Sequence, residues 1–268
     1  MRKGSIILVV LLALVFPATA RAQGGTATVT VVHGLPQFTA DIYVNGKLFL
    51  DGFEPKTATQ PLELSAGDYN IQIRETGSAA NSPPALEGNV SVPSKANLSI
   101  IAYLSSDGQS ALKVYRNDMS PIPAGDVRLV VRHVASVGAL DVQVDSTTVS
   151  SDLINGKQAK ELVSAGTHRL RITSADDGQL LLDPKALHLK EGTSYIVYVI
   201  GSRANSSLDL MAQTLGLASP PTGVPTGDGG RAGDPTRPPW LLALMGVALA
   251  GVVASSVAVA TSARRRKA

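Results

Sequence analysis

The chain of 268 residues contains no cysteine, and aromatic residues make up only 4% of it, with Trp240 as the single tryptophan. The absence of thiols excludes disulfide bonds, thiol catalysis and zinc sites built on thiolates. A fold without disulfides depends on its hydrophobic core, which domains of about 90 residues can supply. The few aromatic side chains also leave few stacking surfaces for sugar rings.

Several catalytic and ligand-binding patterns are missing as well. The sequence has no G-x-S-x-G nucleophile elbow, no dense run of carboxylates for calcium, and no glycine loop ahead of a helix for phosphate. We therefore expect a protein that is not an enzyme and that uses no cofactor and no metal. Paired carboxylates of the glycosidase type are an arrangement that the sequence leaves open.

The first residues have the pattern of a secretory signal peptide. Arg2 and Lys3 precede an apolar run over residues 6–16, and small residues at A-x-A spacing follow. The run is too short to span a bilayer. We expect residues 1–22 to direct export, with cleavage after Ala20 or Ala22.

The other end has the pattern of a membrane anchor. Residues 240–263 carry no charge, and a helix of that length reaches about 36 Å, enough to cross a hydrocarbon core of about 30 Å. Basic residues follow at once in the tail, 264–268, and such residues stay on the cytoplasmic side. The sequence predicts a single-pass protein of the bacterial cell membrane, with its N-terminal part exported and its C-terminus inside.

The charge balance changes once the two ends are set apart. Seven of the 24 basic residues lie in the predicted signal peptide and tail, which leaves 17 basic against 21 acidic residues in the exported part. A mildly acidic surface has no basic patch for phosphates, so a nucleic acid is excluded as a partner. Residues 216–239 contain six glycines and six prolines, which predicts a flexible stalk between the exported part and the membrane.

Between these ends the chain repeats itself. Residues 29–33 match 129–133 and residues 41–44 match 141–144, both at an offset of 100, and residues 63–73 match 162–172 at an offset of 99. Three matched blocks in the same order indicate tandem domains. Each copy shows about seven short alternating segments separated by turn signals, and no amphipathic helix. We expect an all-β protein with two tandem Greek-key-like β-sandwiches, 27–118 and 125–215. The proline-bearing segment 117–125 is expected to hold them in a semi-rigid line.

The first copy resembles a bacterial domain-of-unknown-function family, numbered 4397. That family reads V-V-H-x-x-P, then D-[VI]-Y-V-[ND]-G, then L-x-A-G-x-Y, and the matching residues here are His33, Pro36, Asp41, Tyr43, Asn45 and Gly46. The second copy keeps His133, Asp141 and Gly166 and is divergent elsewhere. The same patterns are similar, more weakly, to small bacterial surface domains of the PEGA type. Neither resemblance brings a catalytic or binding site.

The strongest candidate site is the pair that recurs in both copies, His33 with Asp41 and His133 with Asp141. One interpretation is a polar pair that binds a cation or a sugar hydroxyl. The other, which we favour, is a structural device in which the histidine bonds to backbone and the aspartate caps a turn. A second candidate is a surface patch formed by Phe49 and Phe53.

Repeated modules held away from a membrane suit presentation or adhesion better than catalysis in solution. The leading hypothesis is a non-enzymatic bacterial surface protein that binds an extracellular polymer, a wall component or a partner protein. The alternatives are a hydrolase of surface polymers with a site near His33 and Asp41, and a ligand- or metal-binding accessory of an envelope system. The sequence leaves open the ligand, the oligomeric state and whether the two copies share a function.

Overall fold

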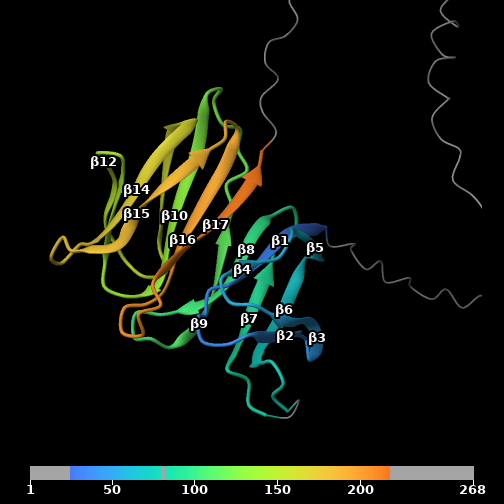
Figure 1. Ribbon diagram of the computed structural model, residues 1–268. Helices are drawn as coiled ribbons and strands as arrows, with labels where there is room; N and C mark the ends of the chain where they lie inside the picture. Colours follow the sequence, from blue (N-terminus) through green and yellow to red (C-terminus); the bar gives the residue numbers. More distant parts are fainter. Residues whose placement is uncertain (1–24, 80–81, 218–268) are drawn as a thin grey trace, which may run out of the picture. The chain divides into compact units, whose positions relative to one another are not determined.

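The computed structural model describes residues 25–79 and 82–217, which consist of β-strands and their connections (Figure 1). The prediction of an all-β fold is thereby confirmed. The predicted signal peptide, membrane anchor and cytoplasmic tail lie outside the described residues, as does the stalk beyond residue 217. In the part of the chain that is described, no helix is long and apolar enough to cross a membrane.

Residues 26–116 form two facing sheets, here called sandwich 1. Its inner sheet, which faces the second half of the chain, has the order β4–β1–β8–β9, and β5 also pairs with β1. Its outer sheet has the order β3–β2–β6–β7. The strands are β1 (Thr26–His33), β2 (Ala40–Val44), β3 (Lys47–Phe53), β4 (Thr57–Ala58), β5 (Leu62–Ser65), β6 (Gly67–Glu75), β7 (Leu86–Val92), β8 (Asn97–Leu104) and β9 (Ser110–Arg116).

Residues 126–216 repeat the arrangement as sandwich 2. The inner sheet has the order β13–β10–β16–β17 and the outer sheet the order β12–β11–β14–β15. In both copies the first strand pairs in parallel with the late central strand, β1 with β8 and β10 with β16. The strands are β10 (Asp126–Ser136), β11 (Leu140–Val144), β12 (Thr147–Leu153), β13 (Gln158–Ser164), β14 (Gly166–Ser174), β15 (Leu180–Leu189), β16 (Thr193–Ser202) and β17 (Asp209–Gly216).

The pattern of apolar residues explains which face of each sheet is buried. In β14 the alternation places Leu170 and Ile172 in the core of sandwich 2, while Arg169 and Arg171 point outward. The central strands β8 and β16 are instead almost continuously apolar and are buried on both faces. Such a strand needs packing on each side, so the inner sheets cannot face water.

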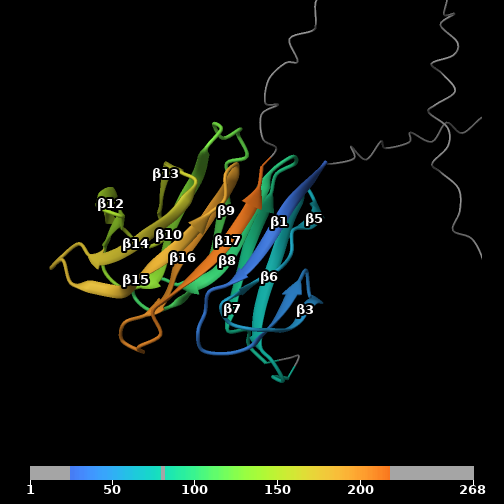
Figure 2. The same ribbon diagram turned by 45° about the horizontal axis from the view of Figure 1, so that its top comes forward.

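A third hydrophobic cluster lies between the two inner sheets. It joins Val32 and Ile101 of sandwich 1 to Val130, Ile196 and other buried residues of sandwich 2. Strand β8 lies against β10 and β16 (Figure 2). The segment 117–125 therefore does not act as a spacer in a line, because the two sandwiches pack face to face in one compact unit.

Polar contacts also cross between the sandwiches. The Asn155 side-chain amide donates to the carbonyl oxygens of Leu104, at 3.0 Å, and Ala135, at 2.6 Å. At the surface Lys56 forms an ion pair with Asp209 at 2.7 Å. Without Asn155, the Leu104 carbonyl oxygen of sandwich 1 would lose a hydrogen-bond partner on burial. This contact therefore helps to fix how the two inner sheets pack together.

Candidate functional site

The two recurring histidines occupy equivalent positions in the sandwiches. His33 and His133 are 2% and 0% exposed, and each Nε2 donates to the carbonyl oxygen five residues further on, Phe38 and Gly138, at 3.0 Å in both cases. Each ring thus fixes the loop that leads from an inner to an outer strand. Burial lowers the pKa of both histidines below the usual value, and the hydrogen bond to the carbonyl only partly opposes this effect.

The two recurring aspartates also hold backbone. Asp41 Oδ1 accepts from the amide of Gly52 at 2.9 Å, and Asp141 Oδ1 accepts from the amide of Asp152 at 3.1 Å, in each case eleven residues on. Both donor residues, Gly52 and Asp152, have positive φ, +60° and +54°, and lie where the strand pairing shifts register. Asp41 also accepts from the Thr76 hydroxyl at 2.7 Å. The Gly52 amide, followed by Thr76, lowers the pKa of Asp41.

The structure does not join the members of each predicted pair. Within the described ranges no hydrogen bond or ion pair links His33 with Asp41 or His133 with Asp141. The same residues contain no group of three or more histidine, aspartate or glutamate side chains that could hold a metal ion. What the geometry supports is two separate backbone clamps per sandwich, repeated in both copies.

Phe49 and Phe53 do not lie on one surface. Phe53 packs on the core of sandwich 1 and stacks on the His33 ring, with centroids 5.7 Å apart. Phe49 is 39% exposed, and its neighbour Leu48 is 52% exposed. The exposed apolar pair of strand β3 is therefore Leu48 with Phe49.

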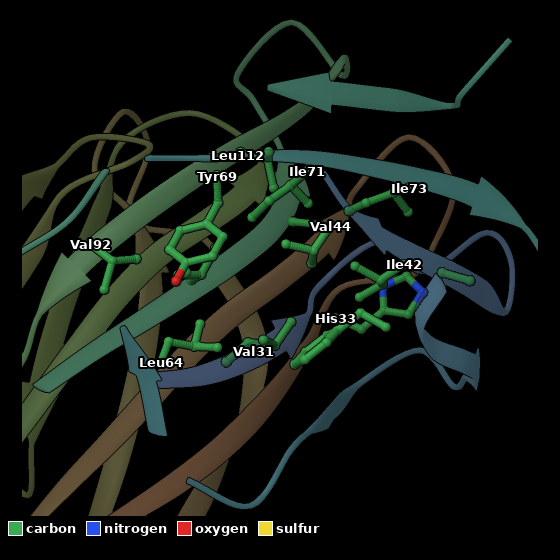
Figure 3. Close-up of a pocket in the computed structure, with 15 residues that line it drawn as sticks. Val31, His33, Ile42, Val44, Leu64, Tyr69, Ile71, Ile73, Val92 and Leu112 are labelled. Carbon is green, nitrogen blue, oxygen red and sulfur yellow. The ribbon is translucent and has the colours of Figure 1, made fainter. Parts of the chain in front are cut away.

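Sandwich 1 contains an apolar cavity between its two sheets (Figure 3). The space open to the centres of water-sized atoms is about 40 Å³. Side chains of both sheets line it, and Phe49, Leu64 and Tyr69 lie on its less buried side. His33 is the buried polar side chain in the lining, and its Nδ1 atom has no hydrogen-bond partner. Sequence reasoning did not find this cavity.

Two small residues distinguish the cavity from the core of sandwich 2. Ala40 of sandwich 1 is equivalent to Leu140 of sandwich 2. Ala102 is the strand partner of His33, and the equivalent partner of His133 is Val199. Leu140 and Val199 are fully buried in their own core. At these two positions sandwich 1 has five fewer carbon atoms. Comparison of the two copies shows both replacements in the sequence, but not that the two positions lie on facing sheets.

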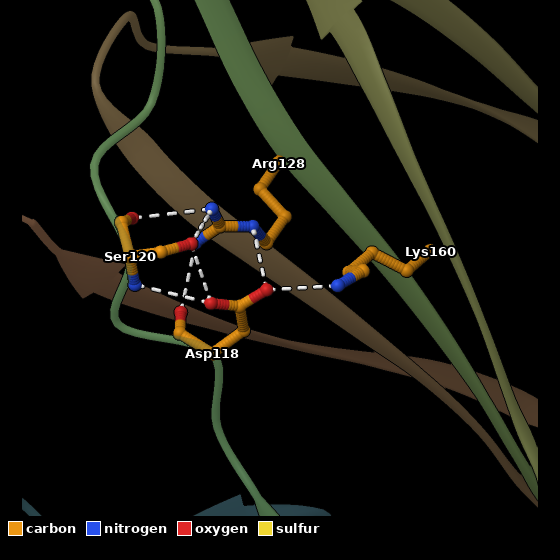
Figure 4. Close-up of polar contacts among 4 residues, drawn as sticks. All are labelled: Asp118, Ser120, Arg128 and Lys160. Carbon is orange, nitrogen blue, oxygen red and sulfur yellow. Dashed lines mark hydrogen bonds and ion pairs between the residues drawn. The ribbon is translucent and has the colours of Figure 1, made fainter.

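A polar cluster ties the connecting segment to sandwich 2 (Figure 4). Asp118 Oδ2 pairs with Lys160 at 2.8 Å and with Arg128 Nε at 3.6 Å, and its other oxygen accepts from Ser120 Oγ at 2.6 Å. Arg128 also donates to the Asp118 carbonyl at 2.8 Å. The bonds from Lys160 and Ser120 hold the pKa of Asp118 well below its usual range. Each charged group has a partner, which indicates a structural role.

A buried arginine spans the space between the sandwiches. Arg132 is 1% exposed and donates to Gln158 Oε1 at 3.0 Å, Tyr198 Oη at 2.7 Å and Asn117 Oδ1 at 2.6 Å. Its guanidinium lies 4.3 Å from the centroid of the Tyr115 ring. Among the described residues no carboxylate is within ion-pair distance of it. Neutral oxygens and aromatic faces therefore stabilise the charge.

Comparison with known proteins finds a family model that matches part of the chain. A family model described as a domain of unknown function (DUF4397) matches residues 27–143, which cover sandwich 1, the connecting segment and the chain into β11. The predicted resemblance to that family is confirmed; the resemblance of the divergent second copy, and that to PEGA-type domains, stay predictions. No curated protein matches the chain.

Solved structures also match the chain. Eleven chains match, among them a Bacteroides uniformis protein for which a role in cell adhesion has been proposed. It is 10% identical, and the match covers 71% of this chain and 97% of that chain with a TM-score of 0.24. A TM-score this low carries no argument about shape or role.

Proposed function

We propose that this protein, whose residues 27–143 belong to the DUF4397 family, is a membrane-anchored bacterial surface protein that binds a partner outside the cell. The family description names no activity, so the proposal depends on the chain itself. The ligand classes that we expect are an extracellular polymer, a wall component or a partner protein.

The observation that carries the proposal is the apolar cavity of sandwich 1. Sandwich 2 fills the equivalent part of its core with Leu140 and Val199. In sandwich 1 this space is left open, beside the exposed side chain of Phe49. Pockets lined by apolar side chains are the usual sites of ligand recognition. The binding role is therefore assigned to sandwich 1, and sandwich 2 is its packed support.

The hydrolase and accessory hypotheses have no comparable observation behind them. A general base must reach the proton that it removes, whereas both His33 and Asp41 are already bonded to backbone in the same way as their counterparts in sandwich 2. The shared geometry supports a structural role for the two residues. If they were catalytic, His33→Gln would abolish an activity and leave the melting temperature unchanged.

A deletion strain tests the binding role directly. Cells that lack the gene, and the same cells complemented with the full chain, are compared for attachment to surfaces coated with polysaccharide, wall or membrane-protein fractions of the envelope. We expect deletion to reduce attachment to one fraction and complementation to restore it. Unchanged attachment to every fraction would overturn the proposal. Protease treatment of intact cells checks in the same experiment that the sandwiches are outside.

A further inference from the structure

We propose that the cavity of sandwich 1 receives a short branched aliphatic side chain, presented by an extended segment of a partner protein that pairs with the free edge of strand β3. This inference rests on the proposed binding function and names the chemistry of the partner.

The walls of the cavity select an apolar occupant. Valine, isoleucine, leucine and alanine side chains of both sheets make up most of the lining. The Tyr69 hydroxyl is already bonded to the Ser65 carbonyl oxygen at 2.7 Å, and among the described residues of the lining His33 Nδ1 is the one buried polar atom without a partner. A water molecule needs two to four polar partners, so a cavity of this kind stays dry and takes apolar groups. Ions and sugars would lose their hydration and gain at most one bond, with His33 Nδ1.

The size of the cavity selects a short group. A single water needs about 10–15 Å³ of such space, so about 40 Å³ holds a group of a few carbon atoms. The side chains of leucine, isoleucine and valine are of this size. A lipid acyl chain would leave most of its length outside.

The edge of sandwich 1 is open where the cavity lies. In sandwich 2 the edge strand β13 is continuous over seven residues and lies against β12. The equivalent edge of sandwich 1 is broken into β4 and β5, of two and four residues, and the interruption contains Pro61. Strand β3 makes fewer contacts with β4 and β5 than β12 makes with β13.

Strand β3 offers the backbone that an extended segment needs. It pairs with β2 on one side, and in the described part of the chain no strand pairs with its other side. A peptide added to a sheet edge gains main-chain hydrogen bonds, and alternate side chains point toward the sandwich interior. Phe49, which lines the cavity and is 39% exposed, supplies apolar area beside the opening.

The test uses the full chain in detergent and three acetylated nonapeptides with the sequence Thr-Lys-Thr-Lys-X-Lys-Thr-Lys-Thr, where X is leucine, alanine or arginine. Binding is measured by fluorescence anisotropy, and hydrogen exchange reports on the amides of β3. We expect the leucine peptide to bind at least tenfold more tightly than the alanine and arginine peptides and to protect β3. Equal affinities of the three peptides would overturn the inference.

A cavity-filling variant locates the binding. Ala102→Val introduces the side chain that sandwich 2 carries at the same position, and Ala186→Val makes the same change at an exposed site of sandwich 2. We expect Ala102→Val to abolish the preference for leucine and Ala186→Val to preserve it. Ala40→Leu is the second filling variant, should Ala102→Val fail to fold. A leucine preference that survives filling contradicts the inference.

The remaining outcomes separate this inference from the function on which it rests. Binding to phosphatidylglycerol vesicles is tested in parallel. If no peptide binds, and vesicles bind the wild type but not Ala102→Val, the occupant of the cavity is a lipid acyl chain and the inference is overturned. If cells with Ala102→Val keep their attachment to the envelope fraction, the surface function stands and the cavity is not its site.

Discussion

The buried guanidinium of Arg132 gives the sharpest test of how the two sandwiches are held together. Its three hydrogen bonds go to neutral oxygens, so the charge is desolvated without the compensation of an anion. Replacing the side chain by an apolar one of similar length removes that desolvation cost together with the bonds. We therefore expect Arg132→Met to be far milder than truncation.

The magnitudes follow from what each variant leaves behind. After Arg132→Ala, Asn117 Oδ1 keeps its bond from Ser99 at 3.3 Å and Tyr198 keeps its bond to Gln213 at 2.7 Å, so the unmet hydrogen bonds cost about 1–2 kcal/mol. The space left by the side chain adds about 2 kcal/mol, for a total of about 3–4 kcal/mol. Arg132→Met avoids the void and is expected to cost about 1 kcal/mol.

Lysine separates charge from geometry at this position. An ammonium is a compact and strongly hydrated charge that cannot reach three acceptors arranged around a planar fork. Arg132→Lys keeps the cost of burying a charge and loses most of the bonds, so we expect it to destabilise the protein more than Arg132→Met does.

Denaturant unfolding of the full chain in detergent, followed by far-UV circular dichroism, measures these differences through the midpoint at a constant slope. Calorimetry adds a second readout, because loosening of the contact in Arg132→Ala is expected to split one transition into two. Equal losses for Arg132→Met and Arg132→Ala would refute the reasoning, as would a lysine variant as stable as the wild type.

Three further predictions concern the polar clamps. Asp118→Asn is expected to cost about 1 kcal/mol or less at pH 6, because the group is partly exposed. Since the folded pKa of Asp118 is lowered, the difference from wild type should begin to shrink below about pH 4 and continue to shrink as the pH falls, and a difference as large at pH 2 as at pH 6 contradicts this. Burial lowers the pKa of His33 and of His133, so at acidic pH the unfolded chain binds protons that the folded chain does not. The free energy of unfolding of the wild type should therefore fall as the pH drops below about 6.5. Unfolding measured at pH 7 and pH 5 should show a smaller fall for His33→Gln. Asp41→Ala should cost about 2 kcal/mol and Asp141→Ala about 1 kcal/mol in the same unfolding assay, because Asp41 accepts one hydrogen bond more than Asp141 does. Equal losses would count against the role of these aspartates in holding the backbone.

Much of the fold could be predicted because the repeat and the alternation of apolar residues determine strands locally. The matched offsets placed His33 and His133 at equivalent positions of equivalent strands, and the structure has His33 as the last residue of β1 and His133 near the end of β10. The near-continuous apolar segments of β8 and β16, which are typical of strands covered on both faces, were a signal that the prediction of two sandwiches in a line missed. The sequence did not say what covers them, because that depends on which sheet meets which.

The cavity could not be predicted for a related reason. Its existence depends on side chains that meet across two sheets, Ala40 from one and Ala102 from the other, about sixty positions apart in the chain. Each alanine alone is an ordinary core residue. Only their joint position opposite His33, known from the fold, turns two small residues into a space.

The two inner sheets have the same strand arrangement but carry different side chains at equivalent central positions. These side chains determine which sheet faces can pack together. Val32 lies beside Ile101 in sandwich 1 where Arg132 lies beside Tyr198 in sandwich 2. Two copies of sandwich 2 brought face to face would bury two like charges, whereas in this chain the single charge meets Tyr115 of sandwich 1 and Asn117 of the connecting segment. The arginine thus makes the halves of one chain complementary to each other and penalises the pairing of two second halves from neighbouring chains.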